Sequence, residues 1–155
     1  MTIRKLNITE SAFLADMLYE AIFIPEGHDP LPREIIEDKS LSRYIENWGK
    51  DNFDIALVKE IDNQPVGAIW GRLLTQENKG FGYVDDSTPE LSMAVKNEYR
   101  NQGIGTKLIK AIVSEYQKIG VKYLSLSVDK ANKAINLYKR LGCEIVAETE
   151  TSWTM

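Results

Sequence analysis

The chain has 155 residues, of which 43% are hydrophobic and 27% are charged, as in an ordinary globular protein. Its net charge of −4 argues against nucleic acid as a main partner, because the positive surplus that neutralises phosphates is missing. The single cysteine, Cys143, excludes an intrachain disulfide and a zinc cluster built from cysteines. No apolar run approaches the roughly 20 residues of a membrane span. We expect one domain over residues 1–155, located in the cytoplasm, with no membrane partner and no metal.

The N-terminal segment predicts a strand followed by a helix. Thr2–Leu6 has strand character, and Asn7 and Glu10 have the spacing of a capping box. Apolar residues then recur at helical spacing until Ile24-Pro25, where the proline ends the helix. These apolar positions are Phe13, Leu14, Met17, Leu18, Ala21 and Ile22.

The next segment predicts a loop, a helix and a hairpin. Pro25–Pro32 holds three of the five prolines and separates the first helix from a second one over Arg33–Trp48. Gly49 follows as a helix stop. Phe53–Ile61 and Gln64–Leu74 predict two strands joined by a tight turn.

The second half alternates strands with helices. Phe81–Val84 predicts a short strand, and an amphipathic helix farther along ends at Gly120. Val121–Val128 alternates apolar and polar residues as a strand does. A last helix ends at Gly142, and Cys143–Thr149 predicts a final strand. The order β-α-α-β-β-β-α-β-α-β predicts an α/β fold with a mixed, mostly antiparallel central sheet and helices on both faces.

The junction between the strand Glu90–Val95 and the helix that follows it is the most informative stretch. Arg100-Asn101-Gln102-Gly103-Ile104-Gly105 directly precedes that helix. Glycines there let backbone N–H groups converge, and the first turn of a helix leaves such donors unpaired beside a positive dipole end. This arrangement suits a phosphate or pyrophosphate. The Rossmann and P-loop patterns both fail, since Leu108 replaces the third glycine and no Gly-Lys-Ser/Thr occurs.

With its Arg-x-x-Gly-x-Gly order, this junction resembles the cofactor motif of the GNAT superfamily, the acyl-CoA-dependent N-acetyltransferases. Asn132–Gly142, with its Asn, Ala, Leu-Tyr and Gly, is similar to the family's second landmark. The resemblance covers nearly the whole chain. It implies direct transfer of an acetyl group from acetyl-CoA to a primary amine of a small molecule or a protein, by a protein that can be a homodimer. The alternative is an acetyl-CoA-binding sensor or interaction module that keeps the fold without catalysis.

The resemblance also implies a set of cofactor contacts. The family places strand backbone beside the pantetheine arm and the acetyl oxygen, and loop amides around the pyrophosphate. The implied cofactor residues are Met93, Ala94, Val95, Arg100, Asn101, Gln102, Gly103, Ile104, Gly105, Thr106, Lys107, Asn132, Ala134 and Leu137. The strand residues alternatively serve only as core, and the arginine alternatively caps the loop instead of binding phosphate.

Acetyl transfer requires a base and an acid, because a primary amine is mostly protonated at pH 7 and the departing thiolate needs a proton. The resemblance places Tyr138 as the acid that protonates the CoA sulfur; the alternative is an ordinary half-buried tyrosine on an apolar helix stripe. Glu90 is the base candidate, acting directly or through water. Regular alternation puts it on the face of Ser92 and Ala94, whereas a bulge reverses that order. The alternative is a solvated carboxylate.

Two further residues are candidate contacts of the acceptor amine. Glu26 lies in the proline-rich loop, and Tyr83 precedes the central strand. His28, the only histidine, is expected to be exposed and not catalytic. Cys143 is expected to be a buried thiol and not an acyl carrier, because no histidine lies near it in the sequence.

Overall fold

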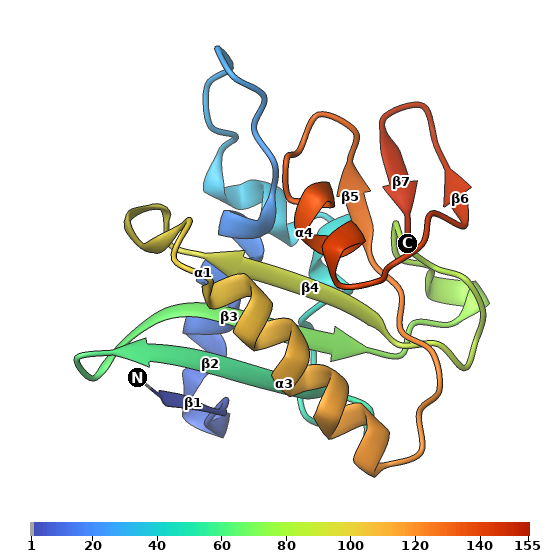
Figure 1. The fold of residues 1–155 in the computed structure, drawn as a ribbon, viewed down its shortest axis with the longest axis horizontal. Helices are drawn as coiled ribbons and strands as arrows, with labels where there is room; N and C mark the ends of the chain where they lie inside the picture. The colour runs from blue at the N-terminus through green and yellow to red at the C-terminus, as the bar shows by residue number, and fades with distance from the viewer. Residues whose placement is uncertain (1) are drawn as a thin grey trace.

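Two sheets that meet at a single point form the framework of the fold (Figure 1). The computed structural model describes residues 2–155. One sheet has four antiparallel strands in the order β1-β2-β3-β4, and the other has three in the order β5-β7-β6. A parallel bridge between Glu90 and Ser125 joins them. The strands are β1 (Thr2–Lys5), β2 (Ile55–Ile61), β3 (Gln64–Arg72), β4 (Glu90–Val95), β5 (Ser127–Asp129), β6 (Ala147–Glu148) and β7 (Ser152–Thr154).

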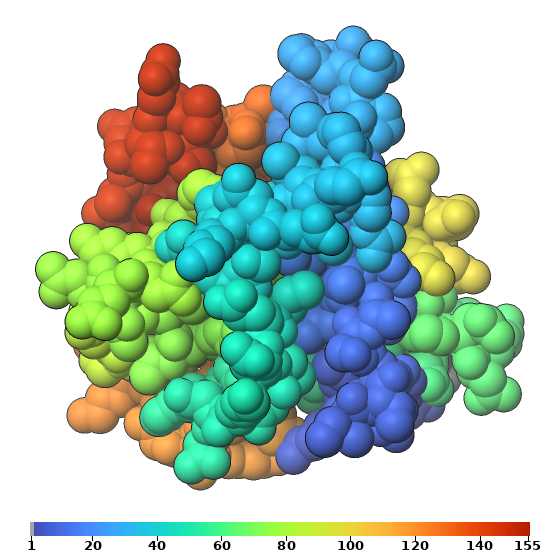
Figure 2. Space-filling view, turned by 180° about the vertical axis from the view of Figure 1, so that it is seen from behind, coloured from blue at the N-terminus to red at the C-terminus, as the bar shows by residue number. Residues whose placement is uncertain are grey.

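Helices cover both faces of the four-stranded sheet. The helix α1 (Ser11–Ala21) packs across β4 on one face, and α3 (Ile104–Lys118) packs on the other face across β2, β3 and β4. The shorter helices are α2 (Lys39–Ser42) and α4 (Ile135–Arg140). Single 3-10 turns occupy Ile8–Glu10, Arg33–Glu37, Gln76–Asn78 and Asn97–Tyr99. Figure 2 shows the face opposite to that of Figure 1, where the blue and cyan part of the chain, which includes α1 and α2, lies in front.

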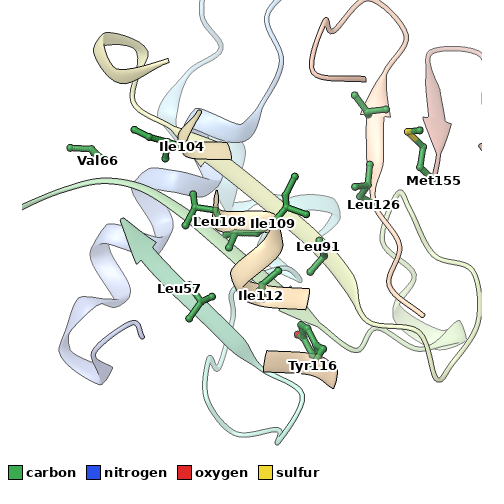
Figure 3. Close-up of a cluster of buried hydrophobic side chains, with 12 residues drawn as sticks. Leu57, Val66, Leu91, Ile104, Leu108, Ile109, Ile112, Tyr116, Leu126 and Met155 are labelled. Atoms are coloured by element: carbon green, nitrogen blue, oxygen red, sulfur yellow. The ribbon is translucent and has the colours of Figure 1, made fainter. Parts of the chain in front are cut away.

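The alternation of side chains along the strands divides the core into two clusters. Leu57, Ile69 and Leu91 pack with Leu108 and Ile112 of α3, as Figure 3 shows for the labelled members. On the other face, small residues of the same strands and the indole ring of β3 pack against α1. The buried members of this second cluster are Leu14, Met17, Leu18, Tyr44, Ala56, Ala68, Trp70, Leu74 and Ala94.

The predicted α/β fold, with a mostly antiparallel sheet and a helix on each face, is confirmed. The hairpin and the first helix lie where the apolar pattern predicts them. The capping box is also present, since the Asn7 side chain accepts a backbone N–H and Glu10 bonds back to the Asn7 amide.

The predicted helix over Arg33–Trp48 is wrong, because the segment breaks into a 3-10 turn, the short α2 and further turns. Asp38 has extended backbone angles, and its side chain accepts the Ser40 N–H and caps α2. Asn47 has a left-handed backbone, with φ of 55°. The segment therefore packs against the second core cluster, on the α1 face of the sheet, instead of forming one straight helix.

Three predicted strands are shorter or absent. Phe81–Val84 forms a turn and a coil, and Val121–Val128 has strand structure only at its end, in β5. Of Cys143–Thr149 only β6 is a strand, and it pairs with β7 in a hairpin. A strand requires a paired neighbour, and residues 121–124 and 143–145 have none in either sheet, while the Val146 N–H bonds the Thr154 carbonyl at the start of the β6–β7 pairing.

A buried ion pair fixes the far end of β3. The Arg72 guanidinium bonds Asp54 through Nη2–Oδ2 at 2.9 Å and Nε–Oδ1 at 3.0 Å, and stacks on Trp48. The Asp54 side chain is 1% exposed. We expect Arg72→Met to lower the free energy of unfolding by about 3–5 kcal/mol in urea denaturation, because it leaves that buried carboxylate without a charge partner and with only the Gly49 N–H as a hydrogen-bond donor.

The matched control is Arg33→Met. Its ion pair with Asp16 leaves both side chains 52% exposed, so its loss is expected to cost less than about 1 kcal/mol. An equal decrease in the free energy of unfolding in the two variants would show that the buried Arg72–Asp54 pair contributes no more to stability than the exposed one.

Candidate active site

The two sheets separate beyond their shared bridge and leave one edge of β4 open. The Leu91 N–H donates to the Ser125 carbonyl at 2.7 Å, and the Ser125 N–H donates to the Pro89 carbonyl at 3.0 Å. The Lys96 N–H bonds a carbonyl of β3. Because backbone groups alternate in direction along a strand, the N–H groups of Met93 and Val95 point away from β3, into the gap.

A cavity of about 790 Å³ occupies this gap. Its walls are the end of β4, the first turn of α3, the segment that follows α1, and residues 132–140. It brings together most of the residues that the sequence assigned to a cofactor. The residues of that set that line the cavity are Met93, Ala94, Val95, Arg100, Asn101, Gly103, Ile104, Gly105, Thr106, Asn132, Ala134 and Leu137. Gln102 and Lys107 belong to the same loop and helix turn but lie outside the lining.

The first turn of α3 presents unpaired amides to this cavity. Gly103 is the N-cap, with a left-handed φ of 79°, and no side chain among residues 2–155 caps the helix. The first bond within the helix runs from the Lys107 N–H to the Gly103 carbonyl, at 3.3 Å. At Gly105, a Cβ atom would lie 3.1 Å from Leu137 and 3.2 Å from Met93, so the glycine allows close packing of three elements.

Arg100 braces the loop before α3. Its Nε donates to the Val95 carbonyl at 3.0 Å, and its Nη2 lies 3.8 Å from Glu20 Oε2. The guanidinium therefore makes the contacts of a loop cap, while it also lines the cavity.

A second cavity, of about 360 Å³, adjoins the first and holds both candidate catalytic residues. Tyr138 lines both cavities and Glu90 lines the smaller one. Burial raises the pKa of the Tyr138 hydroxyl to about 12, with a smaller effect from Cys143, so this hydroxyl keeps its proton at neutral pH. Tyr138 thus lies at the junction of the two spaces with its hydroxyl protonated.

Glu90 is buried, not solvated. β4 pairs with β3 without a bulge, so side chains alternate regularly along β4 and Glu90 lies on the same face as Ser92 and Ala94. Glu90 is 3% exposed, and its Oε2 accepts the Tyr44 hydroxyl at 2.5 Å. Burial raises the pKa of the carboxyl to about 7, although that hydroxyl favours the charged form. The Gly82 amide also favours the charged form but stops short of hydrogen-bonding geometry, so Oε1 has no partner.

The chain matches the model of a known family over most of its length. The acetyltransferase (GNAT) family model aligns with residues 18–143. The chain belongs to this family. The GNAT acetyltransferase is similar to the thialysine N-epsilon-acetyltransferase of Mus musculus, with 31% identity over 142 residues, covering 76% of this chain and 77% of the relative. The enzyme of the same name from Bos taurus is 46% identical over 140 residues, covering 77% and 78%.

Solved GNAT structures share the fold. The paiA N-acetyltransferase of Thermoplasma acidophilum, solved with coenzyme A, superposes with a TM-score of 0.73 at 19% identity, covering 99% of this chain and 96% of the other. The GNAT domain of S. lividans PAT gives a TM-score of 0.68 at 15% identity, covering 99% and 88%. The predicted family and fold are confirmed, and the protein is an acetyl-CoA-dependent N-acetyltransferase that acts on an amine. Between residues 2 and 155, no helix has both the length and the hydrophobicity needed to cross a bilayer.

Two residues predicted to contact the acceptor lie elsewhere in this GNAT acetyltransferase. Glu26 is exposed on the turn after α1, and the Tyr83 hydroxyl donates to Asp86 Oδ1 at 2.5 Å. Neither lines either cavity. The same two segments instead contribute Leu31 to the larger cavity and Phe81 to the smaller one.

Residues missed by the sequence analysis complete the smaller cavity. Tyr44 falls inside the predicted helix over Arg33–Trp48 and Phe81 inside a predicted strand, so neither has a functional signal in the sequence. Asp129, at the end of β5, also lines the smaller cavity. Apart from Glu90 and Asp129, the residues of this lining carry hydroxyl, amide or apolar side chains, and none is a lysine or arginine.

Proposed function

We propose that acetyl-CoA occupies the larger cavity, with its diphosphate on the first turn of α3. The unpaired amides after Gly103 and the positive end of the α3 dipole support this placement. The pantetheine arm follows the open edge of β4, where its amides meet the N–H groups of Met93 and Val95. The thioester then lies at the junction with the smaller cavity, beside Tyr138.

In the proposed reaction, the acceptor amine enters the smaller cavity and loses a proton to Glu90, directly or through one water. Its nitrogen attacks the thioester carbonyl carbon, and a C–N bond forms. The carbonyl oxygen becomes an oxyanion beside the β4 amides, which stabilise it. When the C–S bond breaks, Tyr138 donates its proton to the thiolate and CoA leaves as the thiol. The amide nitrogen then gives up its remaining extra proton, which restores the Tyr138 hydroxyl, and Glu90 releases its proton to solvent.

The acceptor that we propose is a small molecule with a primary amine at the end of a flexible chain, of the kind that thialysine carries. The names of the two curated relatives support this class. The lining of the smaller cavity supports it as well, because Glu90 and Asp129 attract a cation and apolar residues such as Leu18 and Ile22 surround an aliphatic chain.

A diamine is a second candidate acceptor. The α-carboxylate of an amino acid meets no lysine or arginine in the lining of the smaller cavity, whereas a second ammonium group meets Asp129. The acidic composition of the chain, with a net charge of −4, also favours a dication.

Release of CoA thiol over a panel of amines tests these proposals. The panel contains thialysine, lysine, 1,5-diaminopentane and ε-N-acetyl-lysine, whose side-chain amine is blocked. We expect turnover with one or more of the first three and none at the blocked position. A higher kcat/KM for the diamine than for thialysine would favour the second candidate. Uptake of acetyl-CoA in calorimetry without turnover on any amine would contradict catalysis and favour a sensor.

We further propose that the protein works in the cytoplasm as a single domain. The single cysteine and the continuous match to one family model support this proposal. The family resemblance extends it to a homodimer, and the mass in solution by light scattering tests that part.

A further inference from the structure

We propose that Tyr44 is a positioning residue that fixes the Glu90 carboxylate for removal of the amine proton. This inference rests on the proposed function, in which Glu90 is the base. Tyr44 follows α2 and belongs to the core cluster on the α1 face of the four-stranded sheet. Its hydroxyl bonds Glu90, which is 46 residues away in the chain.

The hydrogen bonds around the Tyr44 hydroxyl fix its direction. The Phe81 N–H donates to this hydroxyl at 2.6 Å, so the hydroxyl's own proton is directed to Glu90 Oε2, 2.5 Å away. Burial and the Glu90 charge raise the pKa of Tyr44 far above its ordinary value, so it stays a donor at every working pH. Oε2 is therefore held by the phenol, and the buried Oε1 accepts no hydrogen bond from residues 2–155.

Two glycines allow the chain to close over this pair. A Cβ atom at Gly80 would clash with Glu90 Oε1 and lie 2.5 Å from the Tyr44 hydroxyl. A Cβ atom at Gly82 would lie 2.7 Å from the backbone of Leu126. Between them, the Phe81 ring stacks on the Tyr44 ring with centroids 6.4 Å apart. The carboxylate, the phenol and the backbone of residues 80–82 thus form one packed unit.

No other group packed around Glu90 replaces this bond. Arg43, beside Tyr44, lowers the pKa of Glu90 through its charge but makes no bond to it. Arg72, directly opposite on β3, is paired with Asp54. Ser125 is uncharged, and α1 contributes the apolar Leu18. Loss of the Tyr44 hydroxyl therefore leaves the charged carboxylate with only the weaker contact of the Gly82 amide, which raises the pKa of Glu90 further.

The test is the dependence of kcat/KM on pH in Tyr44→Phe, measured as a ratio to the wild type so that ionisation of the free amine cancels. We expect the acid limb, near pH 7 in the wild type, to move up by about one unit. At pH 6 the variant is then about tenfold slower, and at pH 9 the two rates agree within about twofold. Adding Tyr44→Phe to Glu90→Gln should leave the pH–rate profile of Glu90→Gln unchanged, because that variant already lacks the acid limb.

Tyr116→Phe is the matched control. Tyr116 is also a buried tyrosine, and its hydroxyl donates to the Phe53 carbonyl at 2.7 Å, but it lines neither cavity. It is expected to lose stability without moving the acid limb. An unshifted limb in Tyr44→Phe, or a loss of rate that is equal at all pH values, would overturn the inference. A wild type without turnover on any amine would instead overturn the proposed function.

Discussion

Replacing Glu90 by glutamine is expected to lower kcat by about 10²–10⁴-fold, the usual contribution of a general base. Glutamine has nearly the same shape and can still accept the Tyr44 hydroxyl bond, but it cannot take a proton from the amine. The acid limb near pH 7 should disappear from the pH–rate profile, because burial raises the pKa of this carboxyl to about 7. Steady-state kinetics between pH 5.5 and 9 measure both effects. A variant profile that matches the wild type would exclude Glu90 as the base.

The stability of Glu90→Gln shows whether a loss of activity comes from the missing base or from a misfolded protein. The Glu90 carboxyl has a pKa near 4.5 when unfolded and about 7 when folded. Its contribution to stability is therefore fully present below pH 4.5 and is lost as the pH rises through 7. Glutamine has no such dependence, so Glu90→Gln should become more stable relative to the wild type across this range. A thermal unfolding series from pH 4.5 to 8 measures the difference in stability between the two proteins, and a difference that stays constant over this range would contradict the prediction.

The substitution Tyr138→Phe, which removes the hydroxyl, is expected to lower kcat about 100-fold while KM for acetyl-CoA stays within about twofold. Phenylalanine keeps the ring that packs at the junction of the two cavities but cannot protonate the departing thiolate. A more acidic thiol as leaving group should restore part of the loss, because it needs no proton donor. Thiol release with acetyl-CoA and with an activated aryl thioacetate measures the two cases.

The control for this prediction is Tyr123→Phe. Tyr123 is 74% exposed and lines neither cavity, so its hydroxyl has no access to the reacting atoms. Its turnover is expected to match the wild type. Equal turnover of Tyr138→Phe and the wild type would remove Tyr138 from the reaction and leave it as a packing residue.

The cofactor side of the site was accessible to sequence reasoning because its signals are local. Gly103 and Gly105 stand at a strand-to-helix junction, and the stripe that includes Leu108 and Ile112 fixes which side of α3 faces the sheet. Regular alternation placed Glu90 and Ala94 on one face of β4, as observed. The roles of these residues toward acetyl-CoA stay predictions.

The acceptor side was not accessible, because it is built from distant segments. Tyr44 and Glu90 meet through tertiary packing, and a polar group on an apolar stripe looks like ordinary core. Asp38 interrupts the predicted helix that carries Tyr44. Its backbone is extended, and its side chain accepts the Ser40 N–H and so starts a new helix there. The approach of Gly80 to Glu90 likewise depends on a loop whose path has no periodic pattern.

The open edge of β4 makes the folding stability of the protein, and its resistance to aggregation, depend on the concentration of acetyl-CoA. Exposed N–H groups on a strand edge, such as those of Met93 and Val95, can template contacts with other chains. Occupancy by acetyl-CoA at 100 times its dissociation constant would add about 2.7 kcal/mol to folding stability while covering that edge. A cell depleted of acetyl-CoA would then hold this enzyme in its most aggregation-prone and protease-sensitive form, and so lose it soonest.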